Sequence, residues 1–175
     1  MRSALVIVVL LFLFTLLALV PGCNQKVTAD QLALLQTSAA GAKERAAAAI
    51  LIAPTLKAKD PTNQPAIDRL VKSHINGLSS EALMLASLLN AAQTSATMSQ
   101  AARDQITDEA ATAKGRAGNF EIALKLLDLT TDQQAWTATH LAALQLEASN
   151  LAKLTNLLAA SPPTAPPAAS PTKTN

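Results

Sequence analysis

Residues 29–53 read ADQLALLQTSAAGAKERAAAAILIA, and the spacing of the apolar residues in this stretch decides the fold. Leucines and alanines recur in alternating steps of three and four residues, which is the 3.5-residue repeat of a coiled-coil seam. The seam consists of Leu32, Leu35, Ala39, Ala42, Ala46, Ala49 and Ala53. The repeat predicts a long helix packed against other helices, and its small alanines allow a neighbouring helix to approach closely.

Three later stretches carry the same repeat. Their members are Val71, Ile75, Leu78, Ala82, Leu85, Leu89 and Ala92; then Ala102, Ile106, Ala110, Ala113, Ala117, Phe120, Leu124 and Leu127; and finally Leu141, Leu144, Ala148, Leu151 and Leu158, with Thr155 as one polar member. Four seams of similar length predict four helices, at residues 29–53, 64–95, 99–128 and 132–160.

The composition agrees with an all-α fold. After residue 27 alanine and leucine dominate, tyrosine is absent, and the aromatic residues are Phe120 and Trp136. Such a chain favours helices over sheets. A loop at residues 54–63 and short later connections favour antiparallel neighbours. We therefore expect an antiparallel four-helix bundle, with a helical hairpin that dimerises as the competing arrangement and a homo-oligomer as a further option.

Residues near the predicted helix starts match capping signals. Asp30 places negative charge in the first turn of the first helix. The pairs Thr97 with Gln100 and Thr131 with Gln134 have the spacing of capping boxes, in which a hydroxyl and a glutamine side chain satisfy backbone N–H groups reciprocally. We expect these two pairs to start the third and fourth helices.

The N-terminal segment indicates export. Arg2 precedes seventeen almost purely apolar residues, Ala4 to Val20, which end at Pro21-Gly22-Cys23, and Cys23 is the only cysteine in the chain. This segment resembles the lipobox signal peptide of bacterial lipoproteins. The resemblance implies a signal peptide at residues 1–22, cleavage between Gly22 and Cys23, and fatty acylation of Cys23, such as by palmitate. Residues 23–28 would form the lipidated anchor and a short tether.

By the sorting rule of that family, Asn24 at the position after the cysteine implies the outer membrane, with the bundle in the periplasm. An uncleaved signal anchor is the alternative topology. A helix of seventeen residues spans roughly 25 Å at 1.5 Å per residue, which is short for a hydrocarbon core of about 30 Å.

Charge and motifs exclude several functional classes. The formal net charge is +2, with the charges scattered, which gives no case for nucleic acid. The sequence contains no metal-binding or nucleophile motif, so we expect no cofactor, no metal and no catalysis. Asp104, Asp108 and Glu109, beside Arg103, are interpreted as a solvated helix face.

Gly118-Asn119-Phe120 resembles the turn in the middle of a tetratricopeptide repeat, which would break the third helix at Gly115–Gly118. No second unit follows at a 34-residue period, so a bundle helix kinked at these glycines is the favoured interpretation.

Three residues of the fourth helix lie one turn apart: Asp132, Trp136 and His140. They could form a pH-sensitive or ligand-contacting group. The favoured interpretation is a partly buried Trp136 that seals one end of the bundle beside a solvated His140. His74 lies next to its seam and is expected at the boundary of the core.

Residues 161–175 are rich in proline and have no apolar periodicity, which predicts a disordered tail. We expect a membrane-tethered envelope lipoprotein that acts as a non-catalytic structural or adaptor module with a protein partner. A small-molecule or lipid carrier is an alternative, although alanine-lined seams leave little room for a pocket. A phage-type lysis lipoprotein is a third.

Overall fold

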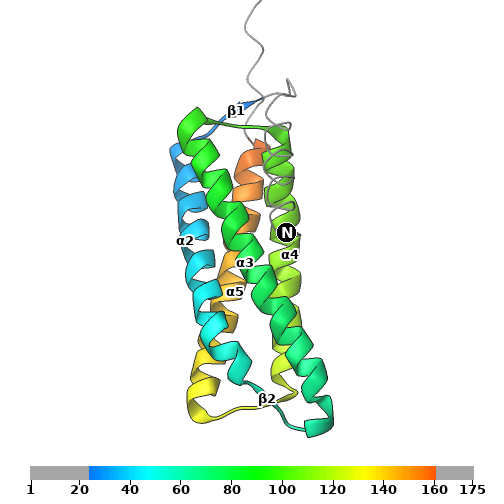
Figure 1. Cartoon of the computed structure of the whole chain (residues 1–175). Coiled ribbons are helices and arrows are strands. Elements are labelled where there is room, and N and C mark those ends of the chain that lie inside the picture. Colours follow the sequence, from blue (N-terminus) through cyan, green and yellow to red (C-terminus); the bar gives the residue numbers. More distant parts are fainter. Residues whose placement is uncertain (1–23, 161–175) are drawn as a thin grey trace, which may run out of the picture.

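The computed structural model describes residues 24–160, so the segment with Gly22 and Cys23 and the proline-rich tail lie outside the described range. Within it four long helices run antiparallel to one another in sequence order, the first from the β1 end of the bundle toward the β2 end (Figure 1). They are α2 (Ala29–Ile52), α3 (Gln64–Ser95), α4 (Gln100–Leu124) and α5 (Thr131–Ala160). The predicted all-α four-helix bundle is confirmed, and its four seams pack within one chain rather than as paired hairpins.

The predicted seams form the core. In α2 every seam residue except Leu32 is buried, and Leu85, Ile106 and Leu151 of the other helices are completely inaccessible to solvent. The alanine-rich α2 packs against both α3 and α5, and α4 packs against α5. The fourth side of the bundle differs, because α3 and α4 make few contacts with each other.

Two short antiparallel strand pairs close the ends of the bundle, and the sequence did not predict them. At one end β1 (Gln25–Lys26) pairs with β3 (Thr97–Met98). At the other end β2 (Lys57–Ala58) pairs with β4 (Leu127–Asp128). The β2 strand lies between the 3-10 turns η1 (Ala53–Thr55) and η2 (Pro61–Asn63). Each strand pair joins two segments far apart in the sequence, which fixes the helix ends relative to one another.

The extra backbone pairing shortens one predicted helix. The seam of the third helix was expected to continue to residue 128, whereas α4 ends at Leu124. Leu127 is buried as the periodicity indicated, but it reaches the core from β4. The apolar repeat identified the buried residue correctly and its secondary structure wrongly.

Two helices begin with a capping box. The Thr28 hydroxyl accepts from the Gln31 backbone N–H, and the Gln31 side chain accepts from the Thr28 backbone N–H at the start of α2. Asp30 lies in the same first turn, as predicted. At α5 the reciprocal pair is Thr130 with Gln133, so the predicted pair of Thr131 with Gln134 was wrong by one residue.

The start of α4 departs further from the prediction. Ser99 is the N-cap, and its hydroxyl accepts from the Ala102 backbone N–H at 3.2 Å. Thr97 lies in β3 instead of capping the helix. The reason is tertiary: Thr97 and Met98 pair with β1 and Met98 is buried, so the N-cap lies two residues after the predicted Thr97.

The α4 helix is continuous through Gly115 and Gly118. The tetratricopeptide-like break at these glycines is therefore wrong, and Phe120 is a buried core residue in the middle of a helix.

Candidate functional site

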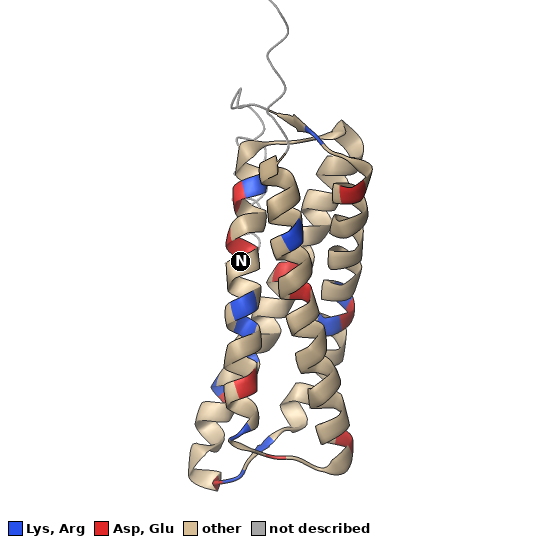
Figure 2. Ribbon diagram, turned by 180° about the vertical axis from the view of Figure 1, so that it is seen from behind, with Lys and Arg blue, Asp and Glu red and all other residues tan. Residues whose placement is uncertain are grey.

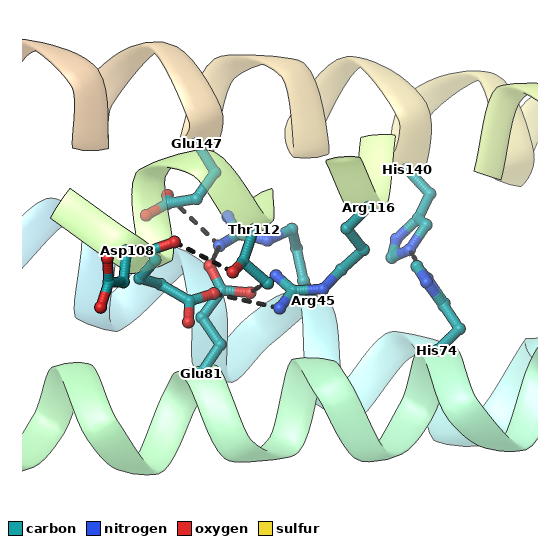
Figure 3. Close-up of polar contacts among 9 residues, drawn as sticks. Arg45, His74, Glu81, Asp108, Thr112, Arg116, His140 and Glu147 are labelled. Carbon is teal, nitrogen blue, oxygen red and sulfur yellow. Dashed lines mark hydrogen bonds and ion pairs between the residues drawn. The ribbon is translucent and has the colours of Figure 1, made fainter. Parts of the chain in front are cut away.

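Five charged side chains meet across the middle of the bundle (Figure 3). We refer to them as the ion layer, which consists of Arg45 of α2, Glu81 of α3, Glu109 and Arg116 of α4, and Glu147 of α5. Each helix contributes at least one member, so the layer crosses the whole core.

Glu81 connects the two halves of the layer. Its Oε1 lies 3.3 Å from Nη2 of Arg45, and its Oε2 accepts from Nη1 of Arg116. Arg45 also contacts Oε2 of Glu147 at 3.2 Å, and Arg116 contacts Oε1 of Glu109 at 3.0 Å. The Glu81 side chain is 0% exposed, so its charge depends on these two guanidinium groups for compensation.

Burial raises the pKa of the Glu81 carboxyl, and the positive charges of Arg116 and Arg45 oppose that rise. Burial likewise raises the pKa of Glu147, with Arg45 opposing it. With every member ionised, two guanidinium groups face three carboxylates. Both guanidinium groups of the ion layer are therefore paired with carboxylates, and neither leaves an uncompensated positive charge.

A sequence signal for the ion layer exists, and the seam analysis missed it. Each of four members lies three residues after one buried core residue and four residues before another, which is a core-facing position of a helix. The sets are Ala42, Arg45 and Ala49; Leu78, Glu81 and Leu85; Ala113, Arg116 and Phe120; and Leu144, Glu147 and Leu151. A charged residue in this phase on all four helices indicates a shared buried layer.

The predicted solvated face of α4 is correct in part. Asp104 and Asp108 are exposed, whereas Glu109 belongs to the ion layer. Arg103, expected beside them, donates to the side chains of Gln25 and Gln100, so it joins β1 to the first turn of α4. Along the described helices acidic and basic residues are interspersed (Figure 2).

A pair of histidines lies on the side of the ion layer that faces β2. Nε2 of His74 and Nε2 of His140 are 2.9 Å apart, so one imidazole donates its N–H to the other (Figure 3). The His74 ring stacks on Phe120 with centroids 5.0 Å apart, and the His140 ring stacks on Trp136 at 4.7 Å. Four rings from three helices thus form one aromatic cluster.

The prediction of a solvated His140 was wrong, because this residue is only 4% exposed. His74 and Trp136 are half-buried, as expected. Asp132 is exposed in the first turn of α5 and does not take part in the ring cluster. The partner of His140 comes from α3, 66 residues away in the sequence.

Burial lowers the pKa of both imidazoles to about 4. The positive charge of Arg116 adds to the effect on His74, and His74 and Arg45 add to the effect on His140. Both rings are therefore neutral near pH 7, which agrees with a hydrogen bond between two imidazoles.

An open cavity of about 360 Å³ lies between α3 and α4, on the side of the ion layer that faces β2. Its wall includes the His74 ring and the edge of the ion layer at Arg116. The other lining residues are Ala53, Ile67, Leu70, Val71, Ser73, Gly77, Thr112, Gly115, Asn119, Phe120, Ala123 and Leu127. Ligand sites of about 300–1,000 Å³ with mostly apolar walls and a few polar groups are common, so this cavity has the size and character of a small site.

Two glycines keep the cavity open. A Cβ built on Gly115 would meet no atom within 4 Å, so a larger side chain there would project into open space. A Cβ on Gly77 would lie 3.4 Å from Nε of Arg116, so this glycine makes room for the guanidinium group. The expectation that alanine-lined seams leave little room for a pocket was wrong, since those alanines close the α2 side while α3 and α4 stay apart.

Residues 24–160 contain no group of three or more His, Cys, Asp or Glu side chains placed to hold a metal ion. In the same range no helix is sufficiently long and apolar to cross a membrane. These residues instead form a cavity with one apolar end and one polar end, beside neutral histidines and a charge-compensated arginine.

Comparison of the chain with protein-family models, curated proteins and solved structures finds no match.

Proposed function

We propose that this protein is a membrane-tethered envelope lipoprotein whose bundle acts by binding rather than by catalysis, with a small apolar molecule in the α3–α4 cavity. The observation that carries the proposal is the cavity itself. Core-facing sides of α3 and α4 that pack poorly against each other leave apolar walls exposed to solvent, and an apolar ligand would remove that surface from water.

The proposed tether is supported by the N-terminal sequence, which ends its apolar segment at Gly22-Cys23. The β1 strand starts two residues after Cys23, at one end of the bundle. His74 lies 21 residues from the end of α3 next to β1, which corresponds to roughly 30 Å along the helix. A tether at Cys23 would thus hold the cavity in the half of the bundle farther from the membrane, where ligand exchanges through water.

Photolabelling tests the ligand proposal on the full-length protein in phospholipid vesicles. The probe is 3-trifluoromethyl-3-phenyldiazirine, a small uncharged molecule that couples to nearby residues under light. We expect labelled peptides from residues 65–77 of α3 and residues 112–123 of α4. The matched variants are Gly115→Leu, which fills the cavity, and Gly118→Leu.

Gly118 is the control because a Cβ at either glycine meets no atom within 4 Å, yet only Gly115 lines the cavity. Labelling of α3 and α4 should be lost in Gly115→Leu and retained in Gly118→Leu. Equal labelling in both variants, or no labelling of these peptides in the parent protein, would refute the cavity as a ligand site.

The tether is tested separately by the mass of the N-terminal peptide after extraction from membranes. A peptide that begins at Cys23 and carries two or three acyl chains is expected, because a single chain anchors a protein only marginally. An unacylated peptide that begins at Met1 would replace the lipoprotein with the signal-anchor topology.

A structural or adaptor module remains the second candidate, and exposed leucines favour it. Leu51 and Leu83 are each 74% exposed, and Leu146 is 61% exposed. They lie on three different helices, so a partner would have to cover more than one side of the bundle. Cross-linking in cells should then capture a defined envelope protein, and the capture should survive Gly115→Leu.

A further inference from the structure

The α3–α4 cavity is graded along its length. Residues of α3 and α4 nearest the ion layer are polar or glycine, namely Ser73, His74, Gly77, Thr112, Gly115, Arg116 and Asn119. The lining residues toward β2 and β4 are all apolar, namely Ala53, Ile67, Leu70, Val71, Phe120, Ala123 and Leu127. The span from Ile67 to Gly77 is about 15 Å along the helix axis. A ligand that matches both ends is therefore amphiphilic and elongated.

The polar end offers hydrogen bonds without free charge. Among residues 24–160, Arg116 is the only charged residue that lines the cavity, and Glu81 and Glu109 already pair with it. His74, the other ionisable group of the wall, hydrogen-bonds to His140. The Asn119 amide and the hydroxyls of Ser73 and Thr112 can donate or accept. The described wall therefore offers a charged head group no unpaired charge of opposite sign, whereas an uncharged head can hydrogen-bond to these side chains.

From this grading and charge pairing we infer that the ligand is an uncharged amphiphile, with a hydroxyl or amide head beside Asn119 and Arg116 and an apolar tail toward Leu127. The inference rests on the proposed function, since it names the class of molecule that occupies the same cavity. It excludes fatty acids, phosphorylated lipids and alkylammonium compounds as preferred ligands.

Three photoactivatable decyl probes that differ only in the head group test the inference on the full-length protein in phosphatidylcholine vesicles at pH 8. The heads are a hydroxyl, a carboxylate and an ammonium, and each carries a diazirine at the far end of the tail. Labelling of the α3 and α4 peptides is normalised to labelling of the lipid, which corrects for partition into the membrane. Gly118→Leu is the control, and Gly115→Leu gives the background.

We expect the alcohol to label the cavity at least about tenfold more than either charged probe. Tail-end labelling should fall on peptides that contain Ile67 and Ala123. A second alcohol probe, with its diazirine next to the hydroxyl, should label near Gly77 and Asn119 instead.

Each outcome decides a different point. If the carboxylate or ammonium probe labels the cavity as strongly as the alcohol, the inferred ligand class is wrong while the proposed function stands. If the tail-end probe labels near Gly77 and Asn119 and the head-end probe labels near Ile67 and Ala123, the inferred orientation is wrong. If no probe exceeds the Gly115→Leu background, the proposed function fails together with the inference.

Discussion

The two halves of the bundle, separated by the ion layer, are built differently. The half beside β1 contains one continuous apolar cluster that includes Leu35, Leu85, Ile106 and Leu151, each 0% exposed. The half beside β2 has two smaller clusters, around Leu78 and around Ile67, together with the histidine pair and the cavity. The same seam pattern thus supports close packing in one half and an open site in the other.

The ion layer separates a closely packed half of the bundle from a half that contains a cavity. Toward β1 all four helices contribute to one core, so packing fixes their positions. Toward β2 a cavity lies between α3 and α4, and aromatic rings and polar groups occupy part of the space that leucines fill elsewhere. Binding sites are expected where packing is incomplete, since a fully packed core has no room for a ligand.

The largest expected effect comes from one truncation in each half. Leu85→Ala should lower the free energy of unfolding by about 3–5 kcal/mol, because the methylenes are removed from a core that cannot collapse around the space. Leu78→Ala on the same helix should lower it by about 2–3 kcal/mol, because its smaller cluster lies near an existing cavity. Urea unfolding of the parent and of both variants measures the two losses in the free energy of unfolding. Equal losses would mean that the halves are packed equally well.

Breaking the ion layer ranks second. Glu81→Gln should lower the free energy of unfolding by about 3 kcal/mol, because Arg45 and Arg116 both lose the buried carboxylate between them. Asp108→Asn, which changes an exposed carboxylate on the neighbouring helix, should stay within about 0.5 kcal/mol of the parent. Thermal and urea unfolding give both values. A tolerated Glu81→Gln would show that the layer contributes little to stability.

The histidine pair should make the half beside β2 sensitive to acid. Its imidazoles have a pKa of about 4 in the folded chain and about 6.5 when unfolded, so the unfolded chain binds more protons between these values. The contribution of the neutral histidines to the free energy of unfolding is complete above pH 6.5. It falls as the pH drops toward 4, by roughly 3 kcal/mol for one imidazole at about 1.4 kcal/mol per pKa unit.

The raised pKa values of Glu81 and Glu147 act in the opposite direction, since the folded chain then takes up protons before the unfolded one. The histidine contribution is therefore read as a difference. Unfolding of the parent and of His74→Phe/His140→Phe is followed by circular dichroism from pH 7 to pH 4. The parent should lose more stability than the double variant over this range, and parallel curves would contradict the assignment.

The smallest expected effect on stability comes from the two exposed glycines of α4. Gly115→Leu and Gly118→Leu should each raise the free energy of unfolding by up to about 1 kcal/mol, because glycine is a poor helix former and neither new Cβ meets a neighbour. Thermal unfolding checks the pair. A large loss of stability in Gly115→Leu alone would show that the cavity wall does not tolerate filling.

The spacing of leucine and alanine determined most of the fold, because a 3.5-residue repeat fixes which side of each helix is buried, and the number of repeats fixes the number of helices. The buried seam of α2 and the buried Leu127 follow from that repeat alone. The charges of the ion layer occupy core-facing positions in the same phase, so the sequence contained them as well.

Only the tertiary structure decided the remainder, because it depends on contacts between segments far apart in the chain. Because Thr97 pairs with β1, the N-cap of α4 is Ser99 instead of Thr97. The hydrogen bond that buries His140 needs His74 from another helix. The cavity exists because α3 and α4 pack loosely against each other, and no local spacing encodes the distance between two helices.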